Sequence, residues 1–133
     1  MKASTLAGLL SCVLVMGAIF ALSAQAQSFE FTRQIFGSYN TLARKSAHFS
    51  EFACLFLALR FTARALSTRF NTASLTICCF LFCVLAAAAD EWHQSFVPGR
   101  SPALRDVLID SIGAASAALV WTVCSFKRKR VSS

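Results

Sequence analysis

Four long stretches of almost continuous apolar residues dominate the pattern along the chain. Short polar segments separate these stretches, and charged side chains enter them only near their ends. A helix needs about 20 predominantly apolar residues to cross the hydrocarbon core of a bilayer, and flanking cations can reach the headgroups from a shorter one. The pattern therefore predicts four membrane-spanning helices, at residues 4–24, 47–65, 73–89 and 104–126.

The composition agrees with a chain that has little material outside the bilayer. Of the 133 residues, 56% are hydrophobic and 14% are charged, and the mean hydropathy is +0.61. A soluble domain of this size exposes most of its chain to water and needs a polar face on every helix, which these stretches lack. We expect an all-α fold, a single domain over residues 1–133 that forms a four-helix transmembrane bundle surrounded by the lipid bilayer.

The first apolar stretch allows two interpretations. Lys2, the apolar run at 6–22 and the small residues Ser23, Ala24 and Ala26 also fit a secretory signal with an Ala-x-Ala cleavage site. The run is longer than the apolar core of an ordinary signal, and this length favours an uncleaved helix. Either interpretation places Gln27 outside the cytoplasm.

The cations are distributed unevenly between the two sides of the predicted membrane. With the N-terminus inside, the cytoplasmic side holds none of the six acids and eight of the 13 Lys and Arg residues: Lys2, Arg60, Arg64, Arg69, Lys127, Arg128, Lys129 and Arg130. This bias follows the positive-inside rule, so we expect both termini in the cytoplasm and the connections at 25–46 and 90–103 outside it. The positive-inside rule thus explains the net charge of +7 without a nucleic-acid partner. The sequence also has no recognition helix, zinc module or aromatic platform of the kind that binds nucleic acid.

Two segments on the outer side carry polar side chains at helical spacing. Residues three or four apart share a helical face, as Lys45, His48 and Glu51 do. In the second segment, a turn at Pro98-Gly99 should lead the chain back to the membrane. Carboxylates at membrane depth are costly unless they are paired or turned inward, so we expect these residues to converge on one site. The candidate acid–base residues are His48, Glu51, Asp90, Glu91 and His93, and the candidate binding residues are Lys45, Gln94, Arg100, Asp106 and Asp110.

The same segments resemble the VanZ-like family of small membrane proteins. The resemblance covers about residues 44–117 and rests on Lys45-x-x-His48-Phe49-x-x-Phe52, Asp90-Glu91-x-His93-Gln94-x-Phe96-x-Pro98-Gly99-Arg100 and Asp106-x-x-x-Asp110-x-x-Gly113. The first apolar stretch matches the family only in being apolar. The family is named after an accessory protein of glycopeptide-antibiotic resistance, so the resemblance implies a role in the cell envelope and a link to tolerance of such antibiotics.

The interpretation we favour is a pocket for an anionic or amphiphilic envelope molecule, such as a lipid headgroup or a lipid-linked cell-wall precursor. Arg100 would hold a phosphate or carboxylate with two hydrogen bonds. His48 or His93, with a neighbouring carboxylate, would act as acid and base if the molecule is also modified. Binding without chemistry explains the same residues.

Three alternatives remain open at this point. The polar residues can form an interhelical clamp, in which Lys45, Arg100 and Arg105 neutralise the acids of a purely structural or accessory protein. A metal site is conceivable at His48-x-x-Glu51 and Asp90-x-x-His93, but the nearby cations weaken it. Proton-coupled transport ranks last, because four short helices are few for a transporter. Neither the motifs nor the resemblance indicates a cofactor.

Overall fold

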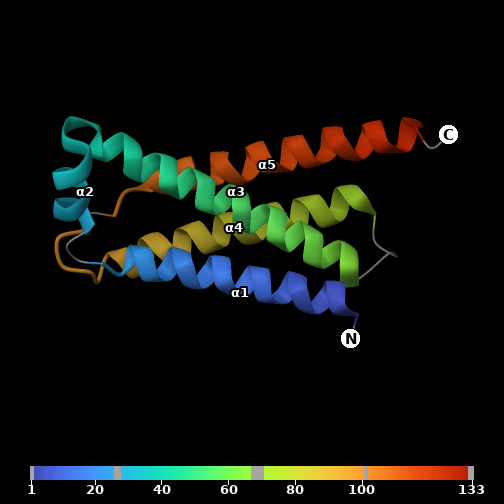
Figure 1. Ribbon diagram of the computed structural model, residues 1–133, viewed down its shortest axis with the longest axis horizontal. Helices are drawn as coiled ribbons and strands as arrows, with labels where there is room; N and C mark the ends of the chain where they lie inside the picture. Colours follow the sequence, from blue (N-terminus) through green and yellow to red (C-terminus); the bar gives the residue numbers. More distant parts are fainter. Residues whose placement is uncertain (1, 26–27, 67–70, 101, 132–133) are drawn as a thin grey trace.

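The computed structural model describes residues 2–25, 28–66, 71–100 and 102–131, and the regular secondary structure of these ranges is all helical (Figure 1). The elements, in chain order, are α1 (Ala3–Ser23), α2 (Ser28–Phe36), the 3-10 turn η1 (Gly37–Tyr39), α3 (Asn40–Leu66), α4 (Thr72–Gln94) and α5 (Leu104–Val131). The predicted all-α class is confirmed.

The four long helices lie side by side, and successive ones run in opposite directions (Figure 1). The amino end of α1 and the carboxyl end of α5 therefore lie at the same end of the bundle. The carboxyl ends of α1 and α4 and the amino ends of α3 and α5 meet at the other end, where the short α2 also lies. We call this second end the site end, because it gathers the two polar segments singled out in the sequence.

Local sequence explains where α4 begins and where the chain turns after it. The side chain of Asn71 accepts a hydrogen bond from the backbone N–H of Ala73 and so caps the first turn of α4. After α4, Gly99 has a φ of 81°, a left-handed conformation that glycine adopts without a steric penalty. The predicted turn at Pro98-Gly99 is confirmed, and it brings the chain back to the start of α5.

The core is centred on α3. Phe52, Leu55 and Phe56 of this helix are fully buried. They belong to a cluster with buried side chains from each of the other long helices: Ile19 of α1, Cys79, Cys83 and Ala87 of α4, and Ala114 and Ala117 of α5. Small residues on α5, among them Gly113 and Ala114, allow its close approach to α3. At Gly113 even a methyl group would overlap the backbone carbonyl of Phe49.

Three helices within the described residues are long and apolar enough to cross a membrane: α1, α4 and the Leu104–Lys127 part of α5. Large apolar side chains such as Leu14, Leu85 and Leu119 are exposed on their outer surfaces, which suits contact with acyl chains. α3 is longer, with 27 residues, but charged side chains recur along it and lower its hydropathy. Length and composition therefore support three of the four predicted spans.

The connection predicted over residues 25–46 is more ordered than the sequence pattern indicated. α2 and η1 occupy its middle, and α3 begins at Asn40 rather than near residue 47. α2 has only nine residues, with Phe31 and Ile35 one turn apart among polar neighbours. Such a segment is amphipathic and has no long apolar run, so it lacks the pattern that indicates a spanning helix. The Thr32 hydroxyl donates to Asn40 Oδ1 and joins α2 to the start of α3.

α1 is packed into the bundle along its whole length. Ile19 is only 1% exposed, Gly8 lies against Thr62, and the Thr5 hydroxyl donates to the carbonyl of Ala65. A chain cleaved after Ala26 would lack all these contacts. Ala26 and Gln27, where cleavage was considered, lie outside the described residues.

Candidate functional site

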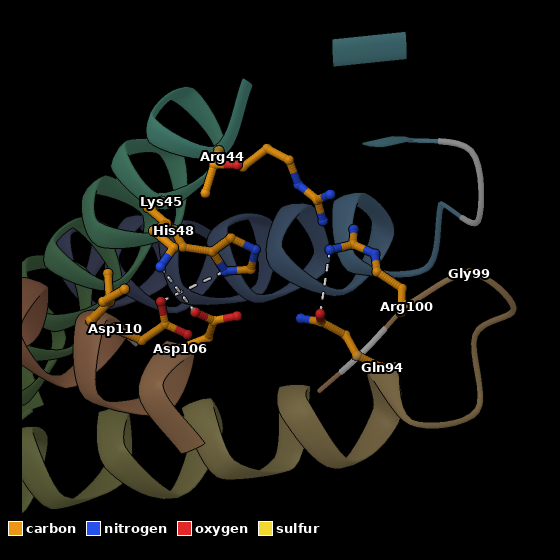
Figure 2. Close-up of a pocket in the computed structure, with 10 residues that line it drawn as sticks. Arg44, Lys45, His48, Gln94, Gly99, Arg100, Asp106 and Asp110 are labelled. Atoms are coloured by element: carbon orange, nitrogen blue, oxygen red, sulfur yellow. Dashed lines mark hydrogen bonds and ion pairs between the residues drawn. The ribbon is translucent and has the colours of Figure 1, made fainter. Parts of the chain in front are cut away.

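A pocket of about 330 Å³ opens at the site end of the bundle, between α3, the start of α5 and the loop that follows α4 (Figure 2). It is lined by one of the five predicted acid–base residues, His48, and by all five predicted binding residues: Lys45, Gln94, Arg100, Asp106 and Asp110. Segments separated by about fifty positions in the sequence thus meet in one cavity.

His48 connects the wall of the pocket to a buried pair of acids. Its Nδ1 lies 3.6 Å from Asp110 Oδ1 and 4.0 Å from Glu51 Oε2. The Asp110 side chain is 1% exposed and that of Glu51 18% exposed, so both carboxylates are largely withdrawn from solvent. The three-residue spacing of Lys45, His48 and Glu51 places them on the side of α3 that faces α5, as predicted.

Lys45 and Asp106 form a second contact between α3 and α5, closer to the pocket mouth. Lys45 Nζ is 3.9 Å from Asp106 Oδ1, and about a third of each side chain is exposed. An ion pair of this length and exposure contributes little to stability, about 0–1 kcal/mol. These two charges therefore remain available to a ligand.

Two guanidinium groups approach each other across the pocket. Figure 2 shows the Arg44 side chain, from α3, extending toward that of Arg100, from the loop. Burial lowers the pKa of Arg100, and the positive charge of Arg44 lowers it further; burial also lowers the pKa of Arg44, against the opposing effect of Asp106. Arginine remains charged at neutral pH despite such shifts, so the pocket holds two neighbouring positive charges.

A buried hydrogen-bonded network lies beside the pocket and joins α1 to α4. Asp90, which is fully buried, accepts from the Ser23 hydroxyl and from Gln94 Nε2, both at 2.7 Å. Arg100 extends the network by donating to Gln94 Oε1 at 3.3 Å and to the carbonyl of Leu22 at 3.0 Å. Asp90 is thus held by neighbouring side chains and does not line the pocket.

Glu91 stabilises the loop between α4 and α5. Its Oε2 accepts a hydrogen bond of 2.8 Å from the backbone N–H of Ala103, directly before α5, and the residue is 6% exposed. This contact closes the segment that presents Gly99 and Arg100 to the pocket. The geometry assigns Glu91 a structural position, although the sequence made it a candidate acid or base.

His93 is the predicted site residue that the structure places apart from the others. Its ring packs edge-on against Phe20 of α1, with centroids 5.6 Å apart. His93 and Gln94 follow Asp90 by three and four positions, yet these residues take different partners on α1: Ser23 contacts Asp90 and Gln94, and Phe20 contacts His93. No hydrogen bond or ion pair joins His93 to the pocket residues in the part of the chain that the structure describes.

Three polar residues of the site were not among the predicted ones: Arg44 and Thr41, which line the pocket, and Ser23. Arg44 is four positions before His48, and this spacing places both on one helical face, so the signal was present beside the chosen Lys45. Ser23 is 1% exposed and hydrogen-bonded to Asp90, yet in the sequence it reads as part of a possible cleavage site. Only the packing of α1 on α4 reveals its role.

The metal alternative finds no support in the geometry. Among the described residues, no group of three or more His, Cys, Asp and Glu side chains is arranged to hold a metal ion. Asp90 and His93, one of the two pairs on which the alternative rested, point to different partners on α1.

Comparison with known proteins gives one match. A model of the VanZ/LLP1 family matches residues 6–125, which include α1 and nearly all of α5. The match therefore extends beyond the segments at 44–117 on which the sequence motifs lie. No curated protein and no solved structure matches the chain significantly.

Proposed function

Because the chain belongs to the VanZ/LLP1 family, we propose that it is a multi-pass membrane protein whose pocket binds the anionic headgroup of a membrane amphiphile on the non-cytoplasmic side. One observation carries this proposal: Arg44 and Arg100, from separate elements, direct their guanidinium groups into one pocket at the end of a bundle of apolar helices. The envelope components considered from the sequence, a lipid headgroup or a lipid-linked cell-wall precursor, have this chemistry.

The charges of the pocket favour a phosphate or carboxylate ligand. Arg44, Lys45 and Arg100 contribute three positive charges, against the carboxylates of Asp106 and Asp110. A guanidinium group binds phosphate or carboxylate with two parallel hydrogen bonds, which are stronger than those between neutral groups. An anion between the two arginines would also relieve the repulsion that lowers the pKa of Arg100.

Aromatic and apolar side chains around the site end favour a ligand with lipid chains. Phe31 and Ile35 are exposed on α2, and Trp92 and Phe96 form an exposed edge-on pair at the end of α4. Short amphipathic helices and exposed aromatic rings are typical of the boundary between headgroups and acyl chains. If this boundary passes through α2, the pocket lies at the level of the headgroups, and the chains of the ligand extend into the bilayer.

α3 completes the proposed membrane domain as a fourth span. The charged side chains in the middle of this helix, Glu51 and Arg60, turn toward the inside of the bundle, as intramembrane charges usually do. Arg60 is 3% exposed, donates to Thr76 Oγ1 and to the carbonyl of Thr72, and lies over the Trp121 ring. With four spans both termini lie on one side, and the excess of cations there assigns that side to the cytoplasm.

We expect the loop after α4 to be accessible from outside the cell. In a variant without native cysteines, Ser95→Cys should react with a membrane-impermeant maleimide in intact cells, because Ser95 is exposed at the site end. Lys127→Cys, at the opposite end of α5, should react only after the cells are permeabilised. The reverse labelling pattern would place the pocket on the cytoplasmic side and contradict the proposal.

Anion binding is tested by titrating the full-length protein, in a neutral detergent, with fluorescent phosphatidic acid. We expect Arg100→Ala to weaken binding by about 10- to 100-fold, the equivalent of about 1.5–3 kcal/mol for a hydrogen bond to a charged group. Arg105→Ala is the matched control, because Arg105 is exposed nearby but does not line the pocket. It should bind as the unmodified chain does.

Two further measurements make this experiment decisive. Phosphatidylcholine, whose headgroup carries no net charge, should bind much more weakly than phosphatidic acid. Thermal unfolding of Arg100→Ala, recorded in the same detergent, separates loss of the ligand contact from loss of the hydrogen bonds to Gln94 and Leu22. Equal binding by Arg100→Ala and Arg105→Ala would refute the pocket, and the link to glycopeptide tolerance would then lose its structural basis.

A further inference from the structure

The His48 ring lies between a buried carboxylate and the open space of the pocket. On one side, its Nδ1 faces Asp110 Oδ1 at 3.6 Å. Figure 2 shows the opposite edge of the ring turned into the cavity, toward Gln94 and Arg100. The histidine therefore offers one nitrogen to the protein and the other to a ligand.

Asp110 has no partner other than His48 that explains its burial. Its side chain is 1% exposed, and within the described residues neither of its oxygens has a hydrogen-bond partner. A buried carboxylate without donors is costly, and such groups concentrate at functional sites. A carboxylate beside one imidazole nitrogen directs the N–H to that nitrogen and leaves a lone pair on the other. The distance of 3.6 Å exceeds a hydrogen bond, but catalytic hydrogen bonds often shorten only when substrate binds.

The two arginines would hold a phosphate next to the free nitrogen of His48. Arg44, Arg100 and His48 line the same cavity of about 330 Å³, which has room for a phosphate group and a water molecule. A water between the phosphorus and Nε2 would be placed for attack, and the guanidinium groups would stabilise the negative charge on the phosphate oxygens in the transition state.

We infer that His48 is a catalytic base that promotes hydrolysis of a phosphate monoester on the bound amphiphile, with Asp110 as its positioning residue. This inference rests on the proposed function, because the same pocket must first bind the anionic headgroup. It adds a reaction to what is otherwise a binding site.

The reaction consumes one water molecule. As the water oxygen forms a bond to phosphorus, one of its protons passes to His48 Nε2, and the P–O bond to the lipid breaks. The departing oxygen takes a proton from solvent at the open mouth of the pocket, and His48 returns its proton to that solvent. The products are inorganic phosphate and the lipid alcohol, and no group is oxidised or reduced.

The test measures binding and phosphate release in parallel on the full-length protein in lipid nanodiscs that contain phosphatidic acid. The unmodified chain should bind phosphatidic acid and release inorganic phosphate. His48→Gln should bind within about threefold of the unmodified chain and lose at least about 100-fold in kcat, the usual contribution of a general base. Ser50→Ala, on an exposed part of the same helix, is the matched control and should keep full activity.

Asp110→Asn provides a second variant that distinguishes positioning from a structural role. Because the amide keeps the shape of the carboxylate but presents the wrong partner to Nδ1, kcat should fall while KM stays unchanged. A structural role alone would lower binding and release together. Glycerol 3-phosphate, which carries the same phosphate monoester without acyl chains, should be hydrolysed far more slowly than phosphatidic acid.

The outcomes separate this inference from the proposed function. Binding of phosphatidic acid without phosphate release by the unmodified chain overturns the reaction and leaves the binding site intact. Release that persists in His48→Gln also overturns it, because another residue must then be the base. If phosphatidic acid binds no better to the unmodified chain than to Arg100→Ala, the proposed function fails, and the reaction fails with it.

Discussion

Replacing Gly113 with alanine is expected to lower the free energy of unfolding by about 3 kcal/mol, the upper part of the range for an overpacked core. The added methyl group would overlap the backbone carbonyl oxygen of Phe49 and lie 3.0 Å from its carbonyl carbon. A side chain can rotate away from such a contact, but here the obstacle is the backbone of α3. The two helices must separate along their shared face, and thermal unfolding in detergent measures the result.

Gly17 is the matched control for this substitution. It also lies within a long apolar helix, but a methyl group there would meet nothing within 4 Å. Gly17→Ala should therefore leave stability unchanged or raise it by up to about 1 kcal/mol, since alanine favours a helix more than glycine does. Equal stability of the two alanine variants would show that α3 and α5 do not pack as closely as the structure has them.

The same substitution should also disturb the pocket. Gly113 follows Asp110 by three residues, so it lies about one turn along α5 on the same side. Separation of α5 from α3 at Gly113 would draw Asp110 away from His48 and Asp106 away from Lys45. The close packing of small residues thus serves the site, because it holds the charged ends of two helices within a few ångströms of each other.

The sequence predicted the fold class and the long helices because both depend on patterns that act over many residues. Long apolar runs indicate spanning helices whatever their partners are. α2 was missed because a nine-residue amphipathic segment has no such run. The direction of each helix across the membrane still rests on the cation count alone.

The sequence predicted some contacts of the candidate site and missed others. Side chains on α3 and α5 meet as their spacing indicated, because both faces are set by helical periodicity. His93 and Glu91 took other partners, since the contact that each makes depends on a segment far away in the sequence: Phe20 on α1 and the backbone of Ala103. Periodicity gives the face of a helix but not the neighbour that covers it.

The structure also places the polar residues of the cluster in two settings, a buried hydrogen-bonded network and the wall of the pocket. Asp90, Ser23 and Gln94 form a buried hydrogen-bonded network, in which Asp90 Oδ1 has no partner among the described residues. His48, Asp106 and Asp110 line the pocket, and Gln94 belongs to both settings. The clamp interpretation fits the first setting, and the proposed binding site rests on the second.

These two settings predict different effects on stability for two aspartates that the sequence assigned to one predicted site. Asp90→Ala should lower the free energy of unfolding by about 2–4 kcal/mol, because it leaves the donors of Ser23 and Gln94 buried without their acceptor. Asp106→Ala should change stability by less than about 1 kcal/mol, since its side chain is 38% exposed and its ion pair with Lys45 is 3.9 Å long.

The affinity for phosphatidic acid provides a second comparison of the same two variants. Asp106→Ala removes a negative charge from the pocket wall, so phosphatidic acid should bind as tightly as before or more tightly, and the gain should shrink at high salt. Asp90→Ala, measured below its unfolding temperature, should bind nearly as well as the unmodified chain, because Asp90 does not line the pocket. If Asp106→Ala instead unfolds as readily as Asp90→Ala while binding is unaffected in both, the whole cluster is a clamp, and the ligand must be sought elsewhere on the molecule.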